Sequence, residues 1–163
     1  AIKKLGKLDT DLVMNLQGDE PLMNIDDIKN LNDQMIKSKS EIGTLASKIV
    51  DKSFYENQNV VKVITKENLD DSHFSEAINF TRKQKNINEN TYHHLGIYCY
   101  KLETLKNFVS YDQSQNEIKN KLEQLRALDN DIKIKVALAK SSPIGVDTEE
   151  DFVAIKKIME YKS

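Results

Sequence analysis

The chain has 163 residues, of which 39% are hydrophobic and 31% charged, a composition that favours one folded domain and excludes a disordered chain. Its net charge of -2 provides no positive field for nucleic acid, and no apolar run reaches the roughly 18 residues of a membrane-spanning helix. The single cysteine, Cys99, cannot form an internal disulfide, which is typical of a cytoplasmic protein.

The predicted elements alternate between strands and helices along the chain. Short apolar or alternating runs predict strands over residues 11–17, 44–50, 60–65, 77–81, 95–100 and 132–139. Apolar residues at helical spacing predict helices over residues 25–36 with Asn24 as N-cap, over 102–108, over 118–128 and after the predicted cap Thr148. The polar segment 83–90 is predicted to be a loop. Such alternation indicates an α/β sandwich, and the absence of repeats and linkers favours a single domain.

The segment NLQGDEP at 15–21 is the strongest local feature of the sequence. Asn15 and Gln17 interrupt an apolar strand just before Gly18, and Asp19 follows where the strand would leave the sheet. Open α/β sheets bind ligands at the carboxyl ends of their strands, so Asp19 is well placed to hold Mg²⁺. A solvated turn explains the spacing equally well.

A second acidic segment, GVDTEED at 145–151, precedes the last predicted helix. The helix dipole favours acidic residues in a first turn, and this accounts for the acids at 149–151. It accounts less well for Asp147, which precedes the predicted cap. Asp19 and Asp147 could therefore converge on one metal ion, although nothing in the spacing requires them to do so.

The segment YHHLGIY at 92–98 carries adjacent histidines. Neighbouring side chains on a strand point to opposite faces, so His93 and His94 could not both ligate one ion. His94, Gly96 and Tyr98 share a face, and Gly96 would leave open space between two polar rings, as in a sugar-binding face. An edge strand with half-exposed aromatic residues is the simpler explanation of the same pattern.

The segment LEQLR at 122–126 combines apolar and polar residues on one predicted helix. Glu123 and Gln124 flank its apolar stripe, and an ion pair between Glu123 and Arg126 would contribute only a few tenths of a kcal/mol. Arg82 and Arg126 are the arginines of a lysine-rich chain, and a guanidinium is the natural bidentate partner of a carboxylate or phosphate. Alone, this segment is weak evidence for a site.

In this order, NLQGDEP, HLGIY, LEQLR and GVDTEED resemble the motifs of the 3-deoxy-manno-octulosonate (Kdo) cytidylyltransferases, from about Asp11 to the last helix. Phe80-Thr81-Arg82 is similar to the family's Phe-Ser-Arg. The sequence departs from the family in 83–90, which lacks the Ala-x-Ile-Pro pattern, and at Glu149, where Pro is usual. The resemblance implies a nucleotide-diphospho-sugar transferase-like fold, an α/β three-layer sandwich with a mixed, mostly parallel sheet, over residues 1–163.

The resemblance also implies a reaction and a site. The family couples Kdo to CMP: the anomeric hydroxyl of Kdo attacks the α-phosphate of CTP in the presence of Mg²⁺, and pyrophosphate leaves. Asp19 and Asp147 match the metal-binding, catalytic acids. The positions that match the sugar-acid site are Gln17, His94, Tyr98, Glu123 and Gln124. Arg82 is a candidate partner of the Kdo carboxylate, because a guanidinium fork fits a carboxylate bidentately.

The resemblance further implies a homodimer, with residues 80–100 as the region to examine for its interface. Family members begin with a Gly-containing basic loop that cradles the CTP phosphates, and no such loop occurs here. We therefore expect the chain to correspond to the C-terminal two-thirds of such an enzyme and to be inactive alone. A sialic-acid-type nucleotidyltransferase and a non-catalytic sugar-acid-binding module are the alternatives.

Overall fold

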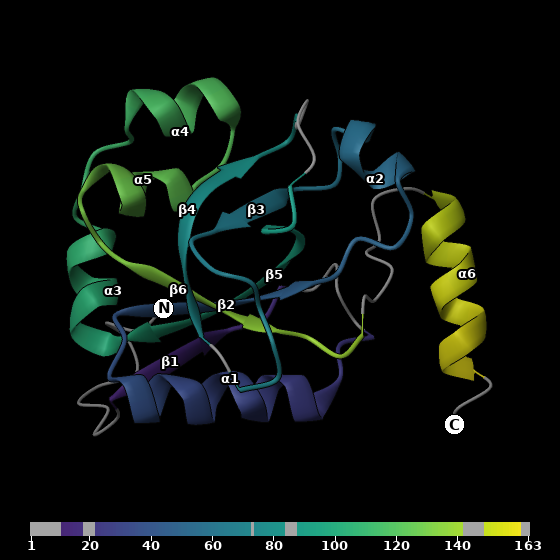
Figure 1. Ribbon diagram of the computed structural model, residues 1–163, viewed down its shortest axis with the longest axis horizontal. Helices are drawn as coiled ribbons and strands as arrows, with labels where there is room; N and C mark the ends of the chain where they lie inside the picture. The colour runs from purple at the N-terminus through teal and green to yellow at the C-terminus, as the bar shows by residue number, and fades with distance from the viewer. Residues whose placement is uncertain (1–10, 18–21, 73, 84–87, 142–148, 161–163) are drawn as a thin grey trace.

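The computed structural model describes residues 11–17, 22–72, 74–83, 88–141 and 149–160 (Figure 1). A six-stranded sheet forms the centre, in the order β1-β5-β2-β6-β4-β3. The strands are β1 (Leu12–Asn15), β2 (Ile42–Ser47), β3 (Lys62–Thr65), β4 (Ser75–Thr81), β5 (Thr91–Lys101) and β6 (Ile134–Leu138). The helices are α1 (Ile25–Ser38), α2 (Ser53–Glu56), α3 (Leu102–Phe108), α4 (Gln115–Asn120), α5 (Gln124–Asp129) and α6 (Glu149–Glu160).

The sheet is mixed, as expected, but the prediction that it is mostly parallel was wrong. Among the described strands, β2 and β6 form the only parallel pair, and the other neighbours pair antiparallel. The strand–helix–strand run β1-α1-β2 does give two strands of the same direction. However, β5 comes from much later in the chain and lies antiparallel between them. A local sequence pattern cannot predict that a distant strand inserts between two others.

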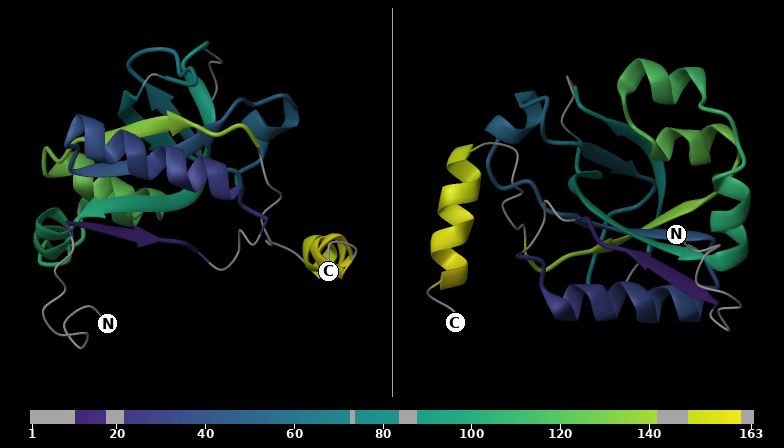
Figure 2. Two further views of the ribbon diagram at one scale, coloured as in Figure 1. Left: turned by 90° about the horizontal axis from the view of Figure 1, so that it is seen from below. Right: turned by 180° about the vertical axis from the view of Figure 1, so that it is seen from behind.

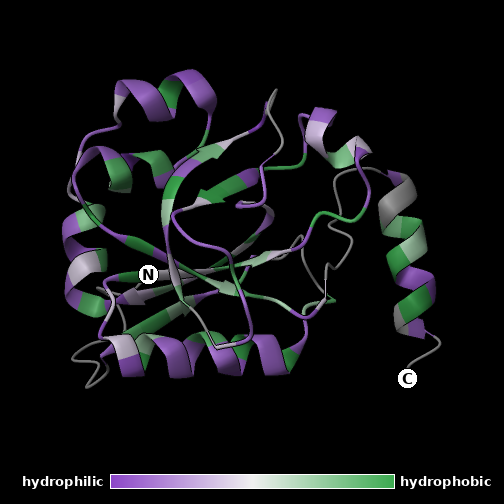
Figure 3. Ribbon diagram, viewed as in Figure 1, coloured by the Kyte–Doolittle hydropathy of each residue, from purple (hydrophilic) through white to green (hydrophobic). Residues whose placement is uncertain are grey.

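Helices cover both faces of this sheet. On one face, α1 contributes Leu31 and Met35 to an apolar cluster with the β5 residues Leu95 and Ile97. On the other face, Phe108 at the end of α3 and Leu125 of α5 join a second cluster. Figure 2 shows α1 along the sheet and α6 standing to one side, and Figure 3 shows hydrophobic residues gathered in the central strands. None of the described helices combines the length and apolar composition needed to cross a membrane.

Helix α1 follows the prediction from its caps and its apolar spacing. The side chain of Asn24 accepts a hydrogen bond from the Asp26 N–H at 2.8 Å, which confirms the predicted N-cap. Leu31 and Met35, four residues apart, are fully buried on one side of the helix. Lys39 ends α1 in the left-handed conformation, with φ of 52°.

The single helix predicted over residues 118–128 was wrong, because the chain forms two short helices there. Lys121 adopts the left-handed conformation, with φ of 53°, and its N–H bonds to the carbonyl of Glu117, so α4 ends before α5 begins. Leu122, which lies between the two helices, and Leu125 on α5 are both in the core. It also brings Glu117 on α4 against Arg126 on α5.

Strand β5 carries three neighbours on two edges. β2 and β1 both pair with Tyr98, and β2 and β3 both pair with His93, so β1 and β3 must share the edge opposite β2. On that edge β1 pairs with residues 98–101 and β3 with residues 91–93. Leu95–Ile97 lie between these two paired stretches of β5.

Candidate active site at the carboxyl edge of the sheet

Strands β1, β2 and β6 run in the same direction and end at one edge of the sheet. Their register forms a row, in which Asn15 lies opposite Tyr98, Tyr98 opposite Thr44, and Thr44 opposite Val136. Each of the three strands ends within a few residues of this row. The carboxyl ends of parallel-running strands are where α/β sheets bind ligands.

Buried Asp27 joins the start of α1 to the chain that leaves β6. Its carboxylate accepts from the backbone N–H of Lys140 at 3.0 Å and from the hydroxyl of Ser141 at 3.3 Å. The segments that follow β1 and β6 therefore depart from neighbouring parts of one edge. Asp27 was not predicted as a functional residue, because the helix dipole already explains an acid in a first helical turn.

The predicted metal-binding acids lie beyond the described ranges. Asp19 follows β1 and Asp147 follows β6, and both fall outside the described residues, as does the predicted cap Thr148. Their convergence stays a prediction. Within the described part of the chain, no group of three or more His, Cys, Asp or Glu side chains could hold a metal ion. Gln17 is described: it is exposed and follows the end of β1, on the edge of β5 that β1 and β3 share.

A bulge in β5 shapes the predicted sugar-binding segment. Thr44 pairs with Tyr98 but the next residue of β2 pairs with Leu95, so β5 carries two extra residues, Gly96 and Ile97. Residues four apart lie about 13 Å apart in a regular strand. Here the ring centroids of His94 and Tyr98 are 5.4 Å apart. The bulge therefore brings the two rings close together.

Thr44 determines which ring nitrogen of His94 carries the proton. The Thr44 hydroxyl lies 2.6 Å from the carbonyl oxygen of Ile97 and 3.0 Å from Nε2 of His94. The carbonyl can only accept, so the hydroxyl donates its one proton to Ile97 and accepts from an Nε2–H of His94. Burial, with a smaller effect of His93, lowers the pKa of His94 to about 3. His94 is thus neutral near pH 7 and keeps an acceptor lone pair on Nδ1.

His94 and Tyr98 belong to a continuous row of rings, which we call the aromatic row. Its members, in spatial order, are Phe80, His94, Tyr98, Tyr100 and Phe108, with successive centroid distances of 5.0, 5.4, 5.8 and 6.2 Å. His94 and Tyr98 are each only 7% exposed. Both pack in the layer between β5 and the helices α3–α5, and their predicted role in sugar binding stays a prediction. His93 faces elsewhere, against Phe54, as strand alternation predicts.

The LEQLR segment lies over the same face as the aromatic row. Leu122 and Leu125 share a core cluster with Tyr98 and Tyr100. Burial raises the pKa of Tyr100, and the negative charge of Glu123 raises it further. The side chain of Glu123 is 70% exposed. Gln124, half-buried, begins α5 next to it. The structure therefore brings both predicted segments to one side of the sheet.

Arg126 has a different main partner from the one expected. Its Nε and Nη2 donate to the two carboxylate oxygens of Glu117 at 2.7 and 2.6 Å, whereas Glu123 lies 3.6 Å away. Glu117 is also the acidic member of a capping box with Ser114, and the Arg126 guanidinium lies 4.9 Å from the centroid of Phe108. The S-x-x-E pattern at 114–117 was a readable signal for the capping role of Glu117.

Arg82 lies just after β4, two residues beyond Phe80 at the end of the aromatic row. It is half-buried, and its Nη1 donates to the carbonyl oxygens of Gln58 at 3.1 Å and Asn59 at 3.4 Å. Its predicted contact with a substrate carboxylate stays a prediction. Ser47, at the end of β2, was not predicted: its hydroxyl is buried and has no hydrogen-bond partner among the described residues.

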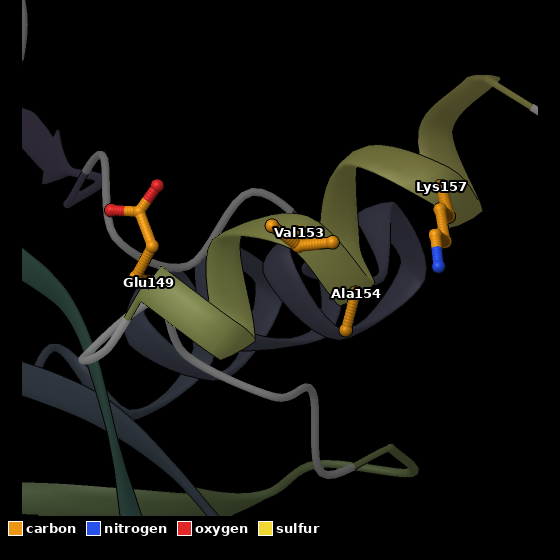
Figure 4. Close-up of a pocket in the computed structure, with 4 residues that line it drawn as sticks. All are labelled: Glu149, Val153, Ala154 and Lys157. Carbon is orange, nitrogen blue, oxygen red and sulfur yellow. The ribbon is translucent and has the colours of Figure 1, made fainter.

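A separate pocket runs along α6. It is lined by Glu149, Val153, Ala154 and Lys157, and Figure 4 shows these side chains along one helix. None of the predicted site residues that the structure describes lines it.

Comparison with known proteins decides the family. The model of a family described as "Cytidylyltransferase" matches residues 1–134. The chain belongs to the cytidylyltransferase family. The predicted resemblance is confirmed by curated relatives named 3-deoxy-manno-octulosonate cytidylyltransferase. The one from Thermodesulfovibrio yellowstonii is 42% identical over 93% of this chain and 61% of its own length. The one from Francisella tularensis subsp. holarctica is 41% identical over 97% of this chain and 66% of its own length.

A solved structure is also similar to this cytidylyltransferase-family chain. It is described as CMP:2-keto-3-deoxy-manno-octonic acid synthetase complexed with CTP, and it matches with a TM-score of 0.84 and 26% identity over 99% of this chain and 67% of that chain. The match confirms an α/β nucleotidyltransferase-like fold with a mixed sheet. The chain spans less than two thirds of the length of the curated relatives above.

Proposed function

We propose that the chain is the part of a Kdo cytidylyltransferase that binds the sugar acid and the catalytic metal. In the reaction, the anomeric oxygen of Kdo forms a bond to the α-phosphorus of CTP and loses its proton. The bond between the α-phosphorus and the oxygen that bridges to the β-phosphate breaks, and pyrophosphate leaves. The observation that carries the proposal is the meeting of HLGIY on β5 and LEQLR on α5 over one aromatic row. These are two of the motifs on which the resemblance to this family rests.

Each proposed contact suits the chemistry of Kdo. The neutral imidazole of His94 can accept a hydrogen bond at Nδ1 from a sugar hydroxyl, and it is too weak a base to take the proton itself near pH 7. The exposed carboxylate of Glu123 can accept from further hydroxyls, and Gln17 and Gln124 can donate or accept. Arg82 would bind the Kdo carboxylate through two parallel N–H donors. The edge of the Tyr98 ring would pack against the sugar.

We further propose that Asp19 and Asp147 hold Mg²⁺. Carboxylates are the ligands that Mg²⁺ prefers, and the strands that precede these two residues end at one edge of the sheet. Mg²⁺ bound there would neutralise charge on the phosphates of CTP. Helices pack on both faces of the sheet, which supports a three-layer arrangement.

We also propose that the protein is cytoplasmic and forms a homodimer, with residues 80–100 at the interface.

Pyrophosphate release tests the proposed reaction. In the full-length protein that carries this chain, release from CTP should require both Kdo and Mg²⁺, and the isolated chain should not turn over. Sialic acid in place of Kdo is the matched control. Equal or greater turnover with sialic acid would favour a sialic-acid-type enzyme. Binding of Kdo without pyrophosphate release would favour a non-catalytic sugar-acid-binding module.

A further inference from the structure

The turn at residues 57–60 presents four successive backbone carbonyls to two cations. Lys62 Nζ donates to the carbonyl oxygens of residues 57 and 60, at 2.7 and 2.9 Å. Arg82 Nη1 donates to those of residues 58 and 59, at 3.1 and 3.4 Å. The turn therefore binds both side chains through its backbone, independently of the side chains that the turn itself carries.

The ammonium of Lys62 is fully satisfied although it is removed from water. Lys62 is 0% exposed, and its third acceptor is the carbonyl oxygen of Arg82 at 2.8 Å. Three N–H donors thus meet three carbonyls. No carboxylate among the described residues forms a salt bridge with Lys62. Burial lowers its pKa, and the charge of Arg82 adds to this effect. An apolar side chain would fill this place on β3 without the cost of burying a charge.

The contacts of Lys62 hold Arg82 at two points. One hydrogen bond from the Lys62 ammonium holds the backbone carbonyl of Arg82. The other two hold the turn at 57–60, whose carbonyls accept hydrogen bonds from the Arg82 guanidinium. Nη1 is thereby committed to the turn. For Nε and Nη2 the described residues supply no acceptor, so that edge of the guanidinium can still form two parallel bonds to a carboxylate.

This cluster borders the candidate site. Lys62 pairs with His93 on β5, on the edge of β5 that β1 also occupies. Gln17 follows β1 on that same edge. Arg82 itself follows the strand that carries Phe80, the end of the aromatic row. A shift of the turn would therefore move Arg82 relative to the proposed sugar-acid site.

We propose that Lys62 is a positioning residue for sugar-acid binding. Its ammonium holds the turn at 57–60 and the backbone of Arg82, so that the Arg82 guanidinium meets the substrate carboxylate without having to reorganise. Lys62 itself does not touch the substrate. This inference rests on the proposed function, in which Arg82 binds the carboxylate of Kdo.

Steady-state kinetics of the full-length protein tests the inference. Lys62→Met keeps most of the apolar stem and removes the ammonium, so the KM for Kdo should rise by about 10- to 100-fold, as expected for a misplaced binding group. The KM for CTP and kcat should stay within about twofold, because only ground-state binding of one substrate is weakened. Lys66→Met, at an exposed position just after β3, is the matched control and should change none of these constants.

The variant Arg82→Gln distinguishes the positioning role of Lys62 from the proposed contact between Arg82 and the Kdo carboxylate. It should raise the KM for Kdo at least as much as Lys62→Met. If Arg82→Gln raises that KM and Lys62→Met does not, the positioning role is wrong and the proposed function stands. If Arg82→Gln has no effect, the carboxylate contact is wrong and the inference fails with it. A parallel loss of kcat and of affinity for both substrates in Lys62→Met would show a general structural role instead.

Circular dichroism and thermal unfolding check that each variant folds. If Lys62→Met does not fold, Lys62→Arg takes its place, because the larger guanidinium keeps the charge but cannot match all three carbonyls. Its KM for Kdo should rise by about threefold or more, again without a change for CTP. An unchanged KM for Kdo in folded Lys62→Arg would overturn the inference.

Discussion

At the scale of single residues, Thr44 and His94 decide what the aromatic row can do. The hydroxyl of Thr44 is committed to Ile97 as a donor, so it can only accept from His94. This leaves the histidine as a neutral ring with a free acceptor position. In the proposed site His94 is therefore a hydrogen-bond acceptor for a sugar hydroxyl, and the role of a general base must belong elsewhere.

The pH dependence of stability tests the neutral state of His94. Its pKa falls from 6.5 to about 3 on folding, so the unfolded chain binds more protons between these values and stability decreases as the pH falls from about 6.5. The slope from this one group is at most about 1.4 kcal/mol per pH unit. His94→Gln, which can still donate to Thr44, should lack this contribution. The difference between wild type and variant, measured by urea unfolding, should shrink toward low pH and be constant above about pH 7.5.

Other groups also titrate in this pH range. One is His93, because burial, with a smaller effect of Lys62, lowers its pKa to about 4. Subtracting the stability curve of the variant from that of the wild type cancels the contribution of every group whose pKa the substitution leaves unchanged. Stability curves of wild type and His94→Gln that run parallel from pH 4 to pH 8 would contradict a depressed pKa at His94.

At the scale of elements, the α4–α5 pair depends on one buried ion pair. Helices of about two turns are not stable by themselves, so tertiary contacts must hold them. Glu117, whose side chain is 5% exposed, accepts from Arg126 twice and also from Gln113 and the N–H of Ser114. Because Glu123 is the N-cap residue of α5 and Gln124 begins the helix, this pair supports the proposed sugar-acid site.

Removal of the Glu117 charge tests this dependence. Glu117→Gln should lower the free energy of unfolding by about 3 kcal/mol, because it leaves the Arg126 guanidinium buried without its counter-charge. Glu123→Gln is the matched control: it removes an acid at 3.6 Å from the same arginine, but one that is 70% exposed. It should cost less than about 0.5 kcal/mol in the same denaturant titration. Equal losses in the two variants would mean that burial is not the cause.

At the scale of the whole molecule, strand direction brings the ends of β1, β2 and β6 to one edge of the sheet. β1 and β6 end near the row that joins Asn15 to Val136, and Asp27 ties the chain after β6 to the start of α1. Residues more than a hundred positions apart in sequence therefore leave the sheet together. This arrangement underlies the proposal that Asp19 and Asp147 share one Mg²⁺.

Replacement of either acid tests the shared metal. Asp19→Asn and Asp147→Asn each remove a charge and almost no volume, so each should lower kcat of the full-length enzyme at least about a hundredfold. Thermal unfolding should be unchanged. Asp112→Asn, on an exposed loop, is the control and should remain fully active. Near-normal Mg²⁺-dependent turnover in either site variant would contradict the shared site.

Local pattern sufficed for the parts of this protein that local forces decide. The cap at Asn24, the helix over 102–108, the opposite faces of His93 and His94, and the ordered motifs of the family were all readable from the sequence, because each depends on neighbouring residues. Four other features could not be read from the sequence: the insertion of β5 between β1 and β2, the bulge at Gly96, the left-handed break at Lys121, and the three carbonyls around the Lys62 ammonium. Each depends on pairing or packing between distant segments, where burial and backbone hydrogen bonding outweigh local preference.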